Sequence, residues 1–164
     1  MTNAIHIRPV HANDYTRLED IRQAAFAPVF ASFHQILGAE ISDIVHRNND
    51  AEQAQYLASI LAPNSEWELH VATQDDLVIG FVSIQINHTT TVGEIGLNAV
   101  HPDWSGAGIG TTLYTFALDR MRAAGMRAAT VSTGGDDSHA PARRAYQKAG
   151  FAVGIPSIWY CQEL

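Results

Sequence analysis

A glycine-rich turn at residues 105–111 has the composition of an anion-binding site. Gly106, Gly108 and Gly110 alternate with small residues, so no bulky side chain prevents backbone N–H groups from converging on a ligand. The apolar residues that follow recur at helical spacing, which places the turn at a helix N-terminus and adds the positive end of the helix dipole. A pyrophosphate is the ligand that such a turn suits best.

The glycine spacing differs from that of two common nucleotide sites. A dinucleotide-binding turn would have its third glycine where this chain has Thr111. A nucleoside-triphosphate loop would have a lysine after the last glycine, and none is present there. An isolated Gly-x-Gly turn would be a helix cap rather than a binding site.

Residues 100–113 resemble the acetyl-CoA signature of the GNAT superfamily of N-acyltransferases. That signature is Gln/Arg-x-x-Gly-x-Gly/Ala, preceded by a strand and Val-x-Pro. Here Val-His-Pro at residues 100–102 precedes Gly-Ile-Gly at residues 108–110. The chain departs from the signature at Ser105, where Gln or Arg is usual, and at Ala107, where Lys or Arg is common. Side-chain contacts to phosphate are lost there, while the backbone amides remain.

A second block, residues 139–151, resembles the other GNAT motif, whose usual form is Asn-x-x-Ala-x-x-hydrophobic-Tyr-x-x-hydrophobic-Gly-Phe. Four residues fall on matching positions: Ala142, Tyr146, Gly150 and Phe151. His139 stands where the family usually has Asn. The two motifs occur in the family's order, and together they cover residues 92–151, more than a third of the chain.

The resemblance implies an α/β (α+β) fold in a single domain over residues 1–164. The central sheet would be mixed, mostly antiparallel and flanked by helices, and it would open between its fourth and fifth strands. Acetyl-CoA would be the cosubstrate, with its pantetheine in that opening. The implied cofactor-binding residues are Asn98, Ala99, Val100, Ser105, Gly106, Ala107, Gly108, Ile109, Gly110, Thr111, His139 and Tyr146.

Acetyl transfer to a primary amine needs a neutral nucleophile, stabilisation of negative charge on oxygen, and a proton for the departing thiolate. An amine with a pKa of about 10.4 is neutral only about once in 10³ at pH 7, so a base must take its proton. The resemblance implies that Tyr146 is the general acid at the sulfur and that backbone N–H groups near residues 98–100 hold the oxyanion. The alternative role for Tyr146 is to pack the last helix against the sheet.

Glu94 is the candidate base, because it lies where the histone-acetylating branch of the superfamily resembles this stretch and carries a catalytic Glu. Strand alternation would put Glu94, Gly96, Asn98 and Val100 on one face, so that the carboxylate and the glycine turn share a side. The alternative is a solvated carboxylate near the strand end. Weaker candidates for the base are His88, Asn98 and His101.

Hydrophobic periodicity predicts the elements that must position these residues. Strands are expected at residues 5–8, 67–73, 77–87, 94–100, 127–133, 151–153 and 157–162. Helices are expected at about residues 14–25, 29–37, 40–46, 51–61, from 108 onward and at 139–149, with Pro28 separating the first two and Ser138 capping the last. Short connections predict an antiparallel meander, and the strand–helix–strand unit around the glycine turn requires parallel pairing.

Composition limits the kinds of ligand and partner that the chain is expected to bind. A net charge of −7 argues against nucleic acid and favours a cationic substrate such as an amine. No apolar run approaches the roughly 20 residues of a membrane span, and no secretion signal is recognisable, so a cytoplasmic location is expected. The single Cys161 excludes an internal disulfide, and the eight scattered histidines predict no metal site.

Two classes of function remain open. The first is an acetyl-CoA-dependent N-acetyltransferase acting by direct attack of a primary amine of a small molecule or peptide, which Tyr146 and Glu94 favour. The second is a non-catalytic acyl-CoA-binding sensor or regulatory module, which the departures at Ser105 and Ala107 favour. Phe30, Phe33 and Trp67 could line an acceptor pocket or belong to the core. A homodimer through the final strands is a further alternative.

Overall fold

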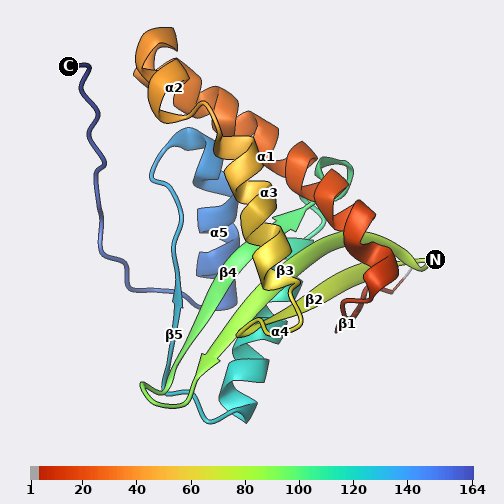
Figure 1. Ribbon diagram of the computed structural model, residues 1–164. Helices are drawn as coiled ribbons and strands as arrows, with labels where there is room; N and C mark the ends of the chain where they lie inside the picture. The colour runs from red at the N-terminus through yellow and green to blue at the C-terminus, as the bar shows by residue number, and fades with distance from the viewer. Residues whose placement is uncertain (1–3) are drawn as a thin grey trace.

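A computed structural model describes residues 4–164 as a five-stranded sheet with helices on both faces (Figure 1). The strands are β1 (His6–Pro9), β2 (Trp67–Gln74), β3 (Leu77–Asn87), β4 (Val92–Val100) and β5 (Ala128–Val131). They lie in this order across the sheet, β1 to β4 antiparallel and β5 parallel to β4. The predicted meander and the parallel strand–helix–strand unit are therefore confirmed.

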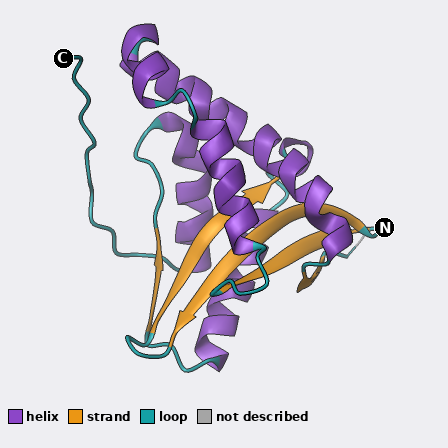
Figure 2. Cartoon of the chain, in the orientation of Figure 1, coloured by secondary structure: helices purple, strands orange, loops and turns teal. Residues whose placement is uncertain are grey.

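Helices α1 and α3 cover one face of the sheet, and α4 and α5 cover the other (Figure 2). The helices are α1 (Tyr15–Leu37), α2 (Ala39–Val45), α3 (Asn49–Ile60), α4 (Ile109–Ala123) and α5 (Ala140–Ala149). Short 3-10 turns are η1 (Ala12–Asp14), η2 (Pro102–Trp104) and η3 (Asp137–His139). Within residues 4–164, no helix combines the length and the apolarity that crossing a bilayer demands.

The sheet separates two hydrophobic cores. The α1–α3 side buries Leu18, Ile21, Leu57, Ile60, Leu69, Val71, Val78, Phe81, Leu97 and Ala99. The α4–α5 side buries Ala72, Ile79, Val82, Ile84, Ile95, Ile109, Leu113, Tyr114, Ala117, Met121 and Tyr146. Each large apolar side chain contributes about 1.5–3 kcal/mol when fully buried, so both faces hold β4 firmly in place.

A β-bulge in β4 changes which way its side chains point. Val82 pairs with Asn98 and Ile84 with Ile95, so the single residue Ser83 faces two residues of β4. Ser83 is fully buried, and its hydroxyl donates to the carbonyl of Leu97 at 2.9 Å. A side chain at position 96 would overlap the Trp67 ring and the Ser83 hydroxyl, so their close packing against the bulge requires Gly96. Beyond the bulge, side chains of β4 again alternate between the two faces, but each points to the face opposite the one that uninterrupted alternation would give it.

The sheet opens between β4 and β5, as expected. Their pairing covers only residues 92–95 of β4, against residues 128–131 of β5. The rest of β4, residues 96–100, continues past the end of β5 and is left unpaired on that side. Backbone N–H and C=O groups at this edge are therefore available to a ligand.

Two predicted features are wrong. Pro28 does not end the first helix, because α1 runs continuously from Tyr15 to Leu37. The loss of one helical hydrogen bond, about 3 kcal/mol with the ring clash, is offset by the burial of Leu18 and Ile21 before the proline and by side-chain contacts of Ser32 and Phe33 after it. Residues 151–153 and 157–162 form no strand; the tail extends past α5 toward α2 (Figure 1). Strand-forming residues alone do not make a strand, because a strand needs a partner to hydrogen-bond.

Candidate functional site

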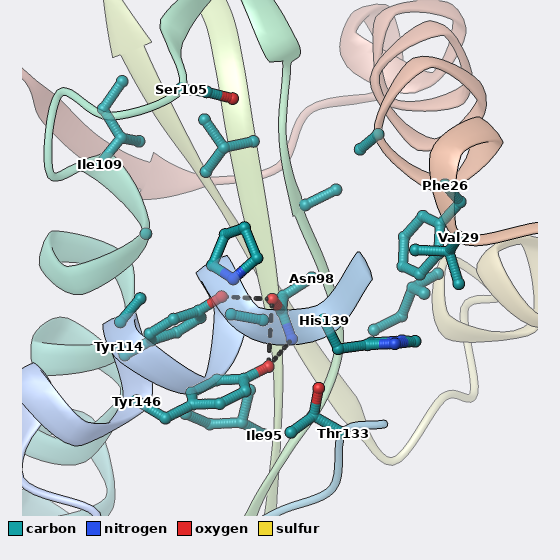
Figure 3. A pocket seen from close by; sticks show the side chains of 18 of the residues that line it. Phe26, Val29, Ile95, Asn98, Ser105, Ile109, Tyr114, Thr133, His139 and Tyr146 are labelled. Carbon is teal, nitrogen blue, oxygen red and sulfur yellow. Dashed lines mark hydrogen bonds between the residues drawn. The ribbon is translucent and has the colours of Figure 1, made fainter. Parts of the chain in front are cut away.

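A cavity of about 790 Å³ lies at the opening between β4 and β5. One wall comes from α1 and α3, the other from the N-terminus of α4 and from α5, and the second half of β4 runs between them (Figure 3). The charged side chains that line it are divided between the walls. Arg144 and Lys148 belong to α5, whereas Glu94 projects to the α1–α3 side. The cavity is thus basic at one wall and acidic at the other.

The glycine turn forms the α4 end of the cavity. Gly106 and Gly108 both have a φ of +80°, a left-handed conformation that favours glycine. Gly108 is the N-cap of α4, and the first helical hydrogen bond runs from the Thr112 N–H to its carbonyl at 3.0 Å. The N–H groups of residues 109–111 are thereby left without helical partners, and these residues line the cavity. This geometry suits an anion.

Every residue of the predicted turn lines the cavity except Ala107. Arg144 and Lys148, four residues apart on α5, were not anticipated. Their helical spacing was visible in the sequence, but nothing showed that this face of α5 borders the turn. They supply positive charge in a cavity where Ser105 and Ala107 supply none.

A hydrogen-bonded group of three side chains lies at the centre of the cavity (Figure 3). The Tyr114 hydroxyl donates to Asn98 Oδ1 at 2.7 Å, and Asn98 Nδ2 donates to the Gly96 carbonyl at 2.9 Å and to the Tyr146 hydroxyl at 3.1 Å. The bond to the Gly96 carbonyl fixes the orientation of the amide, because a carbonyl only accepts. The Tyr146 hydroxyl therefore accepts from Asn98, and its own proton makes only a long contact of 3.5 Å with Asn98 Oδ1, the oxygen that Tyr114 already approaches more closely.

Both tyrosines are buried and their rings pack together, with centroids 4.4 Å apart. Burial raises the pKa of Tyr146 despite hydrogen bonds from Asn98 and Tyr114 that lower it, so the phenol is protonated at neutral pH. Burial raises the pKa of Tyr114 as well. Tyr114 was not singled out in the sequence, where nothing beyond its place in the predicted helix marked it.

The predicted shared face of Glu94 and Asn98 is wrong, because the bulge lies between them. Glu94 and Gly96 face the α1–α3 side, whereas Asn98 and Val100 face α4 and α5. Glu94 is exposed. Burial raises the pKa of Tyr56 of α3, and the negative charge of nearby Glu94 raises it further. It still lines the cavity, from the wall opposite the glycine turn.

His139 lines the cavity at the start of α5. Its Nδ1 lies 2.6 Å from Asp136 Oδ1, and its ring stacks on Phe33 of α1 with centroids 5.9 Å apart. The predicted cap, Ser138, does not cap α5; its N–H and hydroxyl instead donate to Asp136. Burial tends to raise the pKa of Asp136, but hydrogen bonds from Ser138, His139 and Ser32 together hold it well below its usual range.

The remaining candidates lie apart from the cavity. His88 is exposed in the turn between β3 and β4, and His101 accepts a hydrogen bond from the Asp103 N–H in η2. The aromatic residues weighed for an acceptor pocket, Phe30, Phe33 and Trp67, are not among its lining residues. Among residues 4–164, no three His, Cys, Asp or Glu side chains are grouped so that they could hold a metal ion.

Comparisons with known proteins give a family. The family model described as the acetyltransferase (GNAT) family matches residues 30–151. A search of curated proteins finds no match. Among solved structures, a Desulfovibrio desulfuricans protein assigned to the GNAT acetyltransferases is 20% identical with a TM-score of 0.70, covering 93% of this chain and 87% of its own.

Two further structures share the fold. The PaiA N-acetyltransferase of Thermoplasma acidophilum, in complex with coenzyme A, is 19% identical with a TM-score of 0.69 over 94% of this chain and 93% of its own. The ribosomal-protein-S18-alanine N-acetyltransferase of Escherichia coli is 17% identical with a TM-score of 0.66, over 93% and 80%. The family model covers most of the sequence, including both motifs and the cavity's central residues. The chain belongs to the GNAT family of acetyltransferases and is an acyltransferase enzyme.

Proposed function

We propose that this enzyme transfers the acetyl group of acetyl-CoA to a primary amine by direct attack. The observation that carries the proposal is the polar group of Asn98, Tyr114 and Tyr146 at the sheet opening, beside a turn built for an anion. Amine and thioester would meet there from opposite faces of the sheet, because the two walls of the cavity carry opposite charge.

The residues of the α4–α5 wall fit acetyl-CoA. The N–H groups of residues 109–111 would hold the pyrophosphate, with Arg144 and Lys148 adding positive charge. A side chain at Gly106 or Gly108 would project into open space beside the turn, where the phosphates need close approach. The unpaired edge of β4 at residues 98–100 would bind the pantetheine amides and donate to the carbonyl oxygen of the acyl group. Acetyl-CoA supplies the activated acyl group.

The α1–α3 wall suits an amine on an apolar body. Phe26, Pro28 and Val29 of α1 provide apolar surface, and Glu94 is the negatively charged side chain among the residues that line this wall. A carboxylate there attracts an ammonium group and accepts its proton, directly or through water. We therefore assign Glu94 the role of base, and we expect amines with an apolar substituent to be better acceptors than polycations.

Tyr146 has the properties of the acid. Its hydroxyl accepts a hydrogen bond from Asn98 and donates only at the long distance of 3.5 Å, so its proton can pass to a better acceptor, and burial keeps the phenol protonated. When the C–N bond forms and the C–S bond breaks, the electron pair goes to sulfur, and the Tyr146 proton would neutralise it. The asymmetric hydrogen bonding of Asn98 thus prepares Tyr146 for this step.

The alternative, a non-catalytic acyl-CoA sensor, would bind the same ligand and need no acid. One experiment separates the two: thiol release from acetyl-CoA is followed with a panel of primary amines, against a blank without amine. Amine-dependent release identifies the enzyme and ranks its acceptors, from arylalkylamines to polyamines and peptides. Tight binding of acetyl-CoA without thiol release in the presence of any amine would instead support the non-catalytic sensor.

The cellular location and the oligomeric state of the protein remain predictions. A cytoplasmic location is tested by fractionation of cells that produce the chain. A homodimer is tested by sedimentation of the full chain beside a variant ending at residue 151, because the tail beyond it exposes large apolar side chains such as Ile155 and Tyr160. A dimer that survives this truncation would exclude the tail as its interface.

A further inference from the structure

An aspartate–histidine pair lies at the edge of the cavity, between β5 and α5. The two side chains are only 14% and 16% exposed, and Asp136 Oδ1 lies 2.6 Å from His139 Nδ1. The His139 ring lies on the α1 side of Asn98 (Figure 3). Because Asp136 holds Nδ1, Nε2 is the nitrogen left to meet a ligand in the cavity.

Four neighbouring residues hold this pair in place. The Ser32 hydroxyl of α1 donates to Asp136 Oδ2 at 2.9 Å, and the Ser138 N–H donates to the same oxygen at 3.2 Å. Arg143 donates to the carbonyls of Gly134 and Asp136 at 2.6 and 2.7 Å, which fixes the loop. A side chain at position 134 would overlap the His139 ring and the Asp136 carboxylate, so the close approach requires Gly134. Helix capping alone would not need a histidine here.

The chemistry of the proposed reaction leaves a role for such a group. An ammonium group must lose two protons to become an amide nitrogen, the first before it attacks and the second as the C–N bond forms. Sulfur takes one proton from Tyr146. Tyr146 regains that proton from solvent, and the two protons removed from nitrogen both pass to solvent, so the net release is one proton. Glu94 takes the first proton. The second comes off as the C–N bond forms, while Tyr146 still holds its own proton, so it needs a further acceptor that faces the cavity.

We propose that His139, oriented by Asp136, is a second catalytic proton acceptor, which takes this later proton through Nε2 and releases it to solvent. The inference rests on the proposed function and assigns it a residue that the family resemblance placed only at the cofactor. Imidazole suits the task because its ordinary pKa is the closest of any side chain to neutral pH. The ionisable groups around the pair or across the cavity are Asp137, Arg143, Arg144, Lys148, Glu94 and, beyond Phe33, His46.

The test measures amine-dependent thiol release by His139→Gln and His139→Gly. Each should lose about 10–10²-fold in kcat at neutral pH and bind acetyl-CoA with an affinity within about twofold of wild type by calorimetry. Glycine is tolerated at a helix N-cap, so the second variant should fold, as circular dichroism would check. Added imidazole should restore the rate of His139→Gly in proportion to the free-base fraction of imidazole as pH changes.

The matched control is His34→Gln, a histidine exposed on α1, which should behave as wild type and gain nothing from imidazole. A purely structural role for His139 would give a loss that imidazole does not restore. Reduced affinity for acetyl-CoA together with an unchanged pH–rate profile would assign His139 to cofactor binding. Either result overturns the inference and leaves the proposed function intact. Absence of amine-dependent release by the wild type would instead remove the proposed function.

Discussion

Replacing Tyr146 by phenylalanine removes one hydroxyl and leaves the packing of its ring. The hydroxyl accepts from one N–H of Asn98 Nδ2, and the other N–H keeps its bond to the Gly96 carbonyl; the freed N–H is only half-buried and faces the cavity, where water can replace the hydroxyl. The free energy of unfolding should therefore fall by only about 1 kcal/mol. Turnover should fall by about 10²-fold, typical of removing one acid catalyst, with unchanged affinity for acetyl-CoA.

Tyr114→Phe is the matched control, since it deletes the same atom from the neighbouring ring. Tyr114 donates to Asn98 Oδ1 at 2.7 Å, while the Tyr146 hydroxyl lies 3.5 Å from that oxygen. Loss of the closer donor should cost about 1–3 kcal/mol of stability, more than Tyr146→Phe. Turnover should suffer less, because the acid itself remains. Urea unfolding ranks the two variants by lost stability, and thiol release ranks them by lost turnover. The two rankings should be opposite.

The sharper assay varies the leaving group. An acyl donor whose thiol has a low pKa needs little protonation, so Tyr146→Phe should slow it much less than it slows acetyl-CoA. Equal slowing of both donors would refute the acid role and make Tyr146 a residue that positions the cofactor. Tyr114→Phe should show no such dependence on the leaving group.

Three further variants test separate parts of the structure. Glu94→Gln should lower the rate about 10²-fold near neutral pH and recover partly at high pH, where the amine deprotonates itself; a pH–rate profile like that of wild type would assign the proton to water or another group. Gly108→Val should weaken acetyl-CoA binding in calorimetry, since it places a branched side chain at a φ of +80° within the glycine turn, and unchanged affinity of the folded variant would contradict the proposed site. Asp14→Asn tests a stabilising pair: the hydrogen bond from Arg8, against the opposing effect of burial, lowers the pKa of Asp14. The stability that this pair gives is present above the unfolded-state pKa of about 3.9 and is lost as pH falls through the lower folded value. Urea unfolding should therefore show a gap between wild type and variant at pH 7 that closes in acid; a constant gap would mean the carboxylate's charge is not involved.

The central strands and the glycine turn were predictable because their signals are local. Alternation over residues 67–73 and 77–87 matches β2 and β3 to within one residue at each end. The turn was identified from Gly108 and its neighbours, because glycine at a single position indicates a backbone conformation that other residues rarely adopt. Where one short stretch determines a conformation, the sequence alone suffices.

The bulge in β4 could not be predicted, because it depends on how many residues face each other across two strands. Alternation within β4 carries no information about Ser83, which lies on β3 and bonds to Leu97. Gly96 was the available signal, since glycine inside a strand often marks a bulge. Missing it placed Glu94 on the wrong face and concealed the opposite charge of the two walls.

The supporting residues of the site were hidden for a similar reason. Tyr114 reaches Asn98 from another element, and Asp136 reaches His139 across a turn that the sequence marked only as flexible. Neither belongs to the motif residues that carried the resemblance. Such contacts depend on the packing of α4 and α5 against β4, which neither periodicity nor motif matching describes.

Pro28 divides α1 into two parts of unequal rigidity. Proline has no N–H, so the carbonyl of Ala24 receives no helical hydrogen bond from it. All three buried side chains of α1, Leu18, Ile21 and Arg22, lie before this break, and Arg22 is bonded to Glu19, Asp50 and Gln53. The part after it carries cavity residues at its first positions and has no fully buried anchor. We therefore expect Pro28 to act as a hinge. The second part of α1, which Ser32 and Phe33 tie to η3, should bend more readily than the first, its amides should exchange with deuterium sooner, and this wall of the cavity should widen without unfolding of the sheet.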